Sequence, residues 1–146
     1  MDPATGLPDR RELIATVDEM LTEVERPALF AVAVSGYGPL AEANPAEAEE
    51  AMREAARRLG RFVRANDLLA VLAPGVFALA GPGVEHTDVD VLLERVRGVF
   101  ALPVELGDHV VSFPVTIGIA HPVAGVRAED MVAEAEADLR RRQGEN

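Results

Sequence analysis

The feature that most constrains the fold is a mid-chain stretch, residues 67–80, in which two apolar runs flank a Pro74-Gly75 pair. Proline presets φ for the first central residue of a type II turn, and glycine accepts the positive φ that the second requires. The stretch therefore predicts a tight β-hairpin. Because both runs are apolar nearly throughout, we expect a hairpin covered on both faces at the centre of a sheet, with Leu69 and Phe77 buried.

The sequence on either side predicts alternating helices and strands. Helical spacing of apolar residues indicates helices, and short runs rich in β-branched residues indicate strands. Asn44 and Pro45 form a typical helix start, and Gly-Tyr-Gly-Pro at 36–39 predicts a turn or loop. The predicted order is a helix to about 25, a strand at 28–35, a helix at 45–63, the hairpin, a helix at 88–101, strands at 102–106 and 110–120, and a helix at 128–142.

Composition bounds the class of protein. The 146 residues predict one domain, 1–146, with an N-terminal helix in 1–26 and a core in 27–146. A net charge of −11 argues against binding to nucleic acid, and the chain has neither lysine nor cysteine for catalysis or metal binding. No apolar run is long enough for membrane insertion and no signal peptide is visible, so we expect a cytoplasmic protein.

Four segments together resemble the GGDEF domains of diguanylate cyclases. Residues 2–11, Asp-Pro-Ala-Thr-Gly-Leu-Pro-Asp-Arg-Arg, resemble the family's opening Asp-x-Leu-Thr-Gly-Leu-Pro-Asn-Arg-Arg. Arg64-x-x-Asp67 precedes the hairpin at the family's spacing, Val-Thr-Ile-Gly-Ile-Ala at 115–120 is similar to the family's Val-Ser-Ile-Gly-Ile-Ala strand, and Gly-Glu-Asn at 144–146 is similar to its Gly-Arg-Asn. The resemblance implies a mixed α/β (α+β) nucleotidyl-cyclase sandwich, with a mostly antiparallel sheet flanked by helices on both faces.

The positions that carry the family's chemistry differ in this chain. The family's Asp-x-Asp-x-Phe aligns with Ala-Val-Ser-Gly-Tyr at 33–37, and its Gly-Gly-Asp/Glu-Glu-Phe turn aligns with Ala-Pro-Gly-Val-Phe at 73–77. Carboxylate oxygens are the ligands that Mg²⁺ prefers, and the aligned positions hold none. The resemblance therefore implies an inactive domain without catalytic residues, metal or cofactor. The altered positions are Ala33, Ser35, Ala73, Pro74, Gly75 and Val76.

Arg64 and Asp67 match the family's inhibitory site, which binds the product cyclic di-GMP. A guanidinium can bind a guanine edge or a phosphate in bidentate fashion, and a carboxylate can accept from guanine N–H groups. We therefore expect these two residues to be the cyclic di-GMP ligands of a regulatory, signalling domain. A further arginine that assists in the family is Val71 here, which leaves the site incomplete.

Other interpretations stay open. In one of them Asp67 caps the turn into the hairpin and Arg64 ends a helix, and the domain is then a scaffold for a protein partner or a second copy of itself. An enzyme with relocated ligands would require a new acidic cluster. Glu49 lies near the position of a guanine-binding Asp in the family, but the segment before it is one residue shorter.

Overall fold

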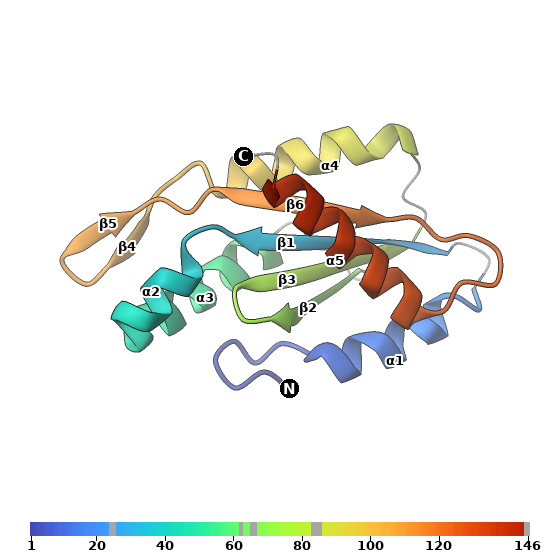
Figure 1. Cartoon of the computed structure of the whole chain (residues 1–146), viewed down its shortest axis with the longest axis horizontal. Coiled ribbons are helices and arrows are strands. Elements are labelled where there is room, and N and C mark those ends of the chain that lie inside the picture. Colours follow the sequence, from blue (N-terminus) through green and yellow to red (C-terminus); the bar gives the residue numbers. More distant parts are fainter. Residues whose placement is uncertain (24–25, 62, 65–66, 83–85, 145–146) are drawn as a thin grey trace.

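The computed structural model describes residues 1–23, 26–61, 63–64, 67–82 and 86–144, and within them the strands form a four-stranded antiparallel sheet and a separate two-stranded ribbon (Figure 1). Strand order in the main sheet is β2-β3-β1-β6, and β4 pairs with β5. The elements are α1 (Arg10–Met20), β1 (Pro27–Val34), α2 (Tyr37–Ala43), α3 (Pro45–Gly60), β2 (Leu68–Ala73), β3 (Val76–Pro82), α4 (His86–Val99), β4 (Val104–Leu106), β5 (His109–Val111), β6 (Val115–Ala120) and α5 (Ala128–Gly144).

Helices cover both faces of the main sheet, as the sequence predicts. One core cluster joins the sheet to α3 and α4 through side chains such as Phe30, Met52 and Leu93. The other joins it to α1 and α5 through side chains such as Leu13 and Met131. Every residue of β1 is buried, because this strand lies between two others and under both helix layers.

The hairpin predicted over 67–80 is confirmed, and both Leu69 and Phe77 are buried. Its predicted place at the centre of the sheet is wrong for one strand, because β3 is an inner strand whereas β2 is an edge strand. The N-terminal segment lies along that edge, where the Val71 amide donates to the Pro8 carbonyl at 2.9 Å. Both faces of β2 are apolar because Leu69 and Val71 belong to one core cluster and Ala70 and Leu72 to the other.

Three other predictions need correction. Residues 37–39, predicted to lie in a turn or loop, form the start of α2, and α1 ends at Met20 instead of near residue 25. The strand predicted at 110–120 is broken at residues 112–114 into β5 and β6. Pro114 has no amide to donate to a ladder, and its carbonyl accepts from the Ser35 amide at 2.9 Å instead. The described helices include none that is both long and apolar enough to cross a membrane.

Helix α5 packs closely on β6 at Gly118. A Cβ built on Gly118 would lie 2.3 Å from the Ala135 carbonyl oxygen and 2.5 Å from the Leu139 amide nitrogen. At this separation Asp138 reaches the edge of the sheet and accepts from the Ile119 amide at 2.9 Å. Burial raises the pKa of Asp138, but the bonds from Ile119 and Arg142 outweigh it and hold the pKa below its ordinary value of 3.8.

Gly118→Ala should destabilise the fold because its methyl group would meet helix backbone, which cannot move aside as a side chain can. We expect a loss of roughly 1–3 kcal/mol in the free energy of unfolding, measured by urea denaturation. Gly98→Ala on α4 is the matched control, since nothing lies within 4 Å of its added Cβ and alanine favours a helix. Equal stability of the two variants would contradict the close packing of α5.

Candidate ligand sites at the two ends of the hairpin

The turn of the β2–β3 hairpin meets the end of β1 at one end of the sheet. Ala33 pairs with Val76, and the Val34 amide donates to the Gly75 carbonyl at 2.8 Å. Gly75 has φ +76, as the second central residue of a type II turn requires. The structure thus brings together four of the altered positions named from the sequence, those at 33, 35, 75 and 76.

This junction does not offer the ligands of a Mg²⁺ site. Ala33 is only 4% exposed within the apolar cluster under α1 and α5, and Ser35 is exposed with its amide bonded to Pro114. Gly75 and Val76 add no polar side chain. Across the described part of the chain, no three His, Asp or Glu side chains gather in a way that could hold a metal ion. The residues present therefore do not fit the cations that diguanylate cyclases use.

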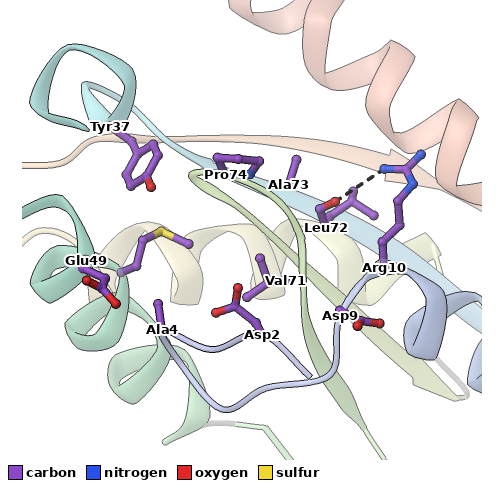
Figure 2. Close-up of a pocket in the computed structure, with 11 residues that line it drawn as sticks. Asp2, Ala4, Asp9, Arg10, Tyr37, Glu49, Val71, Leu72, Ala73 and Pro74 are labelled. Atoms are coloured by element: carbon purple, nitrogen blue, oxygen red, sulfur yellow. Dashed lines mark hydrogen bonds between the residues drawn. The ribbon is translucent and has the colours of Figure 1, made fainter. Parts of the chain in front are cut away.

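A cavity of about 320 Å³ lies beside the turn, between the N-terminal loop, β2 and the start of α3 (Figure 2). Figure 2 shows the Tyr37 ring standing beside Pro74 on one wall of this cavity, with Glu49 across from the loop that carries Asp2. The wall is mostly apolar. Its residues are Asp2, Ala4, Asp9, Arg10, Tyr37, Glu49, Met52, Val71, Leu72, Ala73 and Pro74.

The acidic side chains that line the cavity are engaged in local structure. Asp2 accepts from the Thr5 amide at 3.0 Å and from the Thr5 hydroxyl at 2.8 Å, which closes the N-terminal loop. Asp9 is the N-cap of α1, and the bond from the Glu12 amide lowers its pKa. Glu49 lies 3.8 Å from Arg53 on the next turn of α3.

Arg10 is the cation nearest to the cavity, and it is held by α5. Its guanidinium donates two bonds to Glu136, at 3.0 and 2.8 Å, and a third at 3.5 Å to the Leu72 carbonyl on β2. The hydrogen bond from Arg10 holds the pKa of Glu136 below its usual range. This contact joins the N-terminal helix, the edge strand and α5, and it directs the guanidinium away from the cavity (Figure 2).

Arg64 and Asp67 lie at the opposite end of β2, roughly 20 Å from the turn at the rise of a β-strand. The Arg64 amide donates to Oδ2 of Asp67 at 2.8 Å, and the Asp67 amide donates to the Arg64 carbonyl at 3.0 Å. Asp67 thus caps the turn that leads into the hairpin. Arg64 is exposed and lies beyond α3, which ends at Gly60, so the interpretation that Arg64 ends that helix is wrong.

Val71, which stands where the family has an assisting arginine, is buried against the cluster under α3 and α4. Arg64 and Asp67 are therefore joined by backbone contacts but have no third polar partner from β2. Sequence reasoning missed Tyr37 and Met52 as neighbours of the turn. The Asn44-Pro45 start and the apolar spacing after it located α3 in the sequence, whereas its position over the hairpin depends on the fold.

The comparisons with known proteins agree with this architecture. The sequence matches the GGDEF domain family of diguanylate cyclases over residues 1–146, so the chain belongs to that family. A search of curated protein sequences gave no significant match.

Solved structures from two bacteria share the fold. The diguanylate cyclase SiaD of Pseudomonas aeruginosa, in complex with its activator SiaC, is 25% identical with a TM-score of 0.90 over 99% of this chain. The chain spans 58% of the SiaD chain. The GGDEF domain of PA1120 (TpbB or YfiN), from the same organism, is 21% identical, with a TM-score of 0.90 over 99% of this chain and 89% of that one. The coiled coil and GGDEF domain of DgcB from Caulobacter crescentus, in complex with c-di-GMP, is 18% identical, with a TM-score of 0.88 over all of this chain and 81% of that one.

Asp67→Ala should weaken the turn before β2, because it removes the acceptor of the Arg64 amide. We expect a loss of about 1 kcal/mol, which corresponds to a melting temperature lower by roughly 2–4 °C. Asp67→Asn keeps an acceptor oxygen and should lose less. Arg64→Ala keeps the amide and should leave the melting temperature unchanged; an equal loss in that variant would show that the guanidinium, and not the cap, stabilises the turn.

Proposed function

We propose that this chain is a catalytically inactive member of the GGDEF family that acts as a regulatory domain. The observation that supports the proposal best is the junction of β1 with the hairpin turn. Its positions hold Ala33, Ser35, Gly75 and Val76, where the resemblance expects the acids that bind Mg²⁺ and assist catalysis. Phosphoryl transfer depends on metal ions that neutralise developing charge, and these side chains cannot hold them.

An enzyme with relocated ligands is the competing interpretation, and the cavity offers the acids that it would need. Asp2, Asp9 and Glu49 lie around the cavity, but each already serves a loop, a helix cap or an ion pair. Binding of one cation by any two of them would compete with these contacts. Their engagement supports inactivity over relocation.

Incubation of the purified protein with GTP and either Mg²⁺ or Mn²⁺ should give no cyclic di-GMP above background, because the junction of β1 with the hairpin turn offers the cations no carboxylate at positions 33, 35, 75 and 76. The product is measured by liquid chromatography with mass detection. A GGDEF domain that retains the family's acids, assayed alongside, verifies the conditions. Product that increases in proportion to protein concentration would overturn the proposal of inactivity.

The proposed ligand of the domain is cyclic di-GMP, bound at the end of the hairpin opposite the turn. DgcB, which has the same fold, is known in complex with this dinucleotide. Arg64 is exposed, so its guanidinium can meet a guanine edge or a phosphate without prior unfolding. Asp67 holds the Arg64 backbone through Oδ2, which fixes the base of the arginine side chain and leaves Oδ1 as an acceptor for guanine N–H groups.

Calorimetric titration should give binding of cyclic di-GMP to the wild type and a ten- to hundred-fold weaker affinity for Arg64→Ala. Each charge-assisted hydrogen bond that is lost contributes roughly 1.5–3 kcal/mol. Arg64→Lys should also weaken binding, because a point charge cannot reproduce the planar fork. Arg95→Ala, an exposed arginine on α4, is the matched control and should bind as the wild type does.

A second candidate function is favoured by the role of Asp67 as a turn cap. If the carboxylate serves only the turn, the domain is a scaffold for a protein partner, as SiaD with its activator SiaC illustrates for a related domain. Absence of binding at high micromolar cyclic di-GMP would leave this scaffold function. Binding that Arg64→Ala does not weaken would indicate a different nucleotide site.

A further inference from the structure

Strand β6 forms one edge of the main sheet (Figure 1). It pairs with β1 on one side, and among the described residues no strand pairs with it on the other. The Ile119 amide donates to Asp138 and not to β1, so it faces the open side. Because backbone groups alternate between the two sides of an antiparallel strand, the amides of Ile117 and Val115 face the same way. This edge of β6 therefore presents the groups that would pair with a further strand.

The sequence of β6 makes this edge prone to pairing. Residues 115–120, Val-Thr-Ile-Gly-Ile-Ala, carry no charge and no proline, and four of the six are β-branched. Edge strands of soluble proteins are usually protected by charges, prolines or bulges, whereas short uncharged segments of high β-propensity associate readily. The side chains of β6 itself supply neither a charge nor a proline. Protection of this edge must therefore come from another element.

Asp138 on α5 supplies a charge at this edge. Its Oδ2 accepts from the Ile119 amide and from Nε of Arg142, both at 2.9 Å, and its Oδ1 accepts from Nη2 of Arg141 at 3.0 Å. Only 14% of the Asp138 side chain is exposed, and its pKa lies below the ordinary value, so the carboxylate is charged at neutral pH. It occupies the position from which the carbonyl of an added strand would accept the Ile119 hydrogen bond.

We infer that the Asp138 carboxylate blocks the open edge of β6 and thereby prevents β6 of one copy of the chain from pairing antiparallel with β6 of a second copy. Two identical edges paired in this way are related by a two-fold axis, so each copy supplies what the other requires. An added strand cannot bond to the Ile119 amide without displacing the carboxylate, which Arg141 and Arg142 hold in place. This role is independent of the proposed nucleotide site and of the lost cation ligands.

Asp138→Ala removes the block and leaves the backbone of β6 unchanged. We expect association that increases with protein concentration and reaches about twice the wild-type mass, measured by size-exclusion chromatography with light scattering. Asp138→Asn keeps an acceptor oxygen but not the charge, so it should associate more weakly than the alanine variant. Glu134→Ala is the matched control, because it removes one negative charge from an exposed position on the same helix and should keep the wild-type mass.

A second substitution tests whether β6 is the contact between the copies. Val115 is the first residue of β6, and its amide faces the open side, so proline at this position removes no bond to β1. The ring and the missing amide should prevent a second strand from pairing there. We therefore expect D138A/V115P to have the wild-type mass.

Three results would overturn the inference: the wild-type mass for folded Asp138→Ala at every concentration, equal association of Glu134→Ala, or association of D138A/V115P equal to that of Asp138→Ala. Circular dichroism and thermal melts verify that each variant is folded. If Asp138 only attached α5 to β6, its loss would lower the melting temperature without a change in mass. Should Asp138→Ala not fold, Asp138→Asn decides, and the wild-type mass for that folded variant would overturn the inference.

Discussion

The contact that links most parts of this fold is the close packing of α5 on Gly118. Because the helix backbone lies where a Cβ would be, α5 lies against β6 more closely than any side chain would allow. The short distance lets Asp138 reach the Ile119 amide. It also brings Glu136 close enough to accept two hydrogen bonds from Arg10. Through Arg10 the same helix is joined to the N-terminal segment and the edge of β2. One glycine thereby links the last helix of the chain to its first.

Local chemistry explains which parts of the fold could be predicted from the sequence. Pro74-Gly75 and Asn44-Pro45 act on neighbouring backbone, so the hairpin and the start of α3 could be located without knowledge of the remaining chain. The strand order could not be predicted. The apolar sequence of β2 is the same for an inner strand that pairs on both sides and for an edge strand whose free side is covered by the N-terminal segment. Residues 110–120 predict one strand, and the break at Pro114 depends on a partner that directly follows β1, Ser35.

The candidate sites show the same division. The junction of positions 33, 35, 75 and 76 could be predicted because the resemblance supplies the spatial relation that sequence spacing alone lacks. The role of Asp67 as a turn cap was one of the alternatives drawn from the residues, because its bond to Arg64 spans only three positions. The contact of Tyr37 with Gly75 could not be predicted. It requires α2, whose Gly-Tyr-Gly-Pro start is typical of a loop, and a turn that is bonded to β1.

The two ends of the hairpin differ in what a change of residue can achieve. At the turn end, Ala33 is buried in an apolar cluster, so an unpaired carboxylate in its place would cost stability. At the opposite end, Arg64 extends from a turn that its own side chain does not stabilise, and the cap comes from the Asp67 carboxylate and a backbone amide. Because the exposed Arg64 side chain does not take part in this turn bond, its identity can be selected for binding a ligand alone. This physical difference between the two ends supports our proposal that a ligand is bound at the exposed Arg64 and that the turn end has no catalytic role.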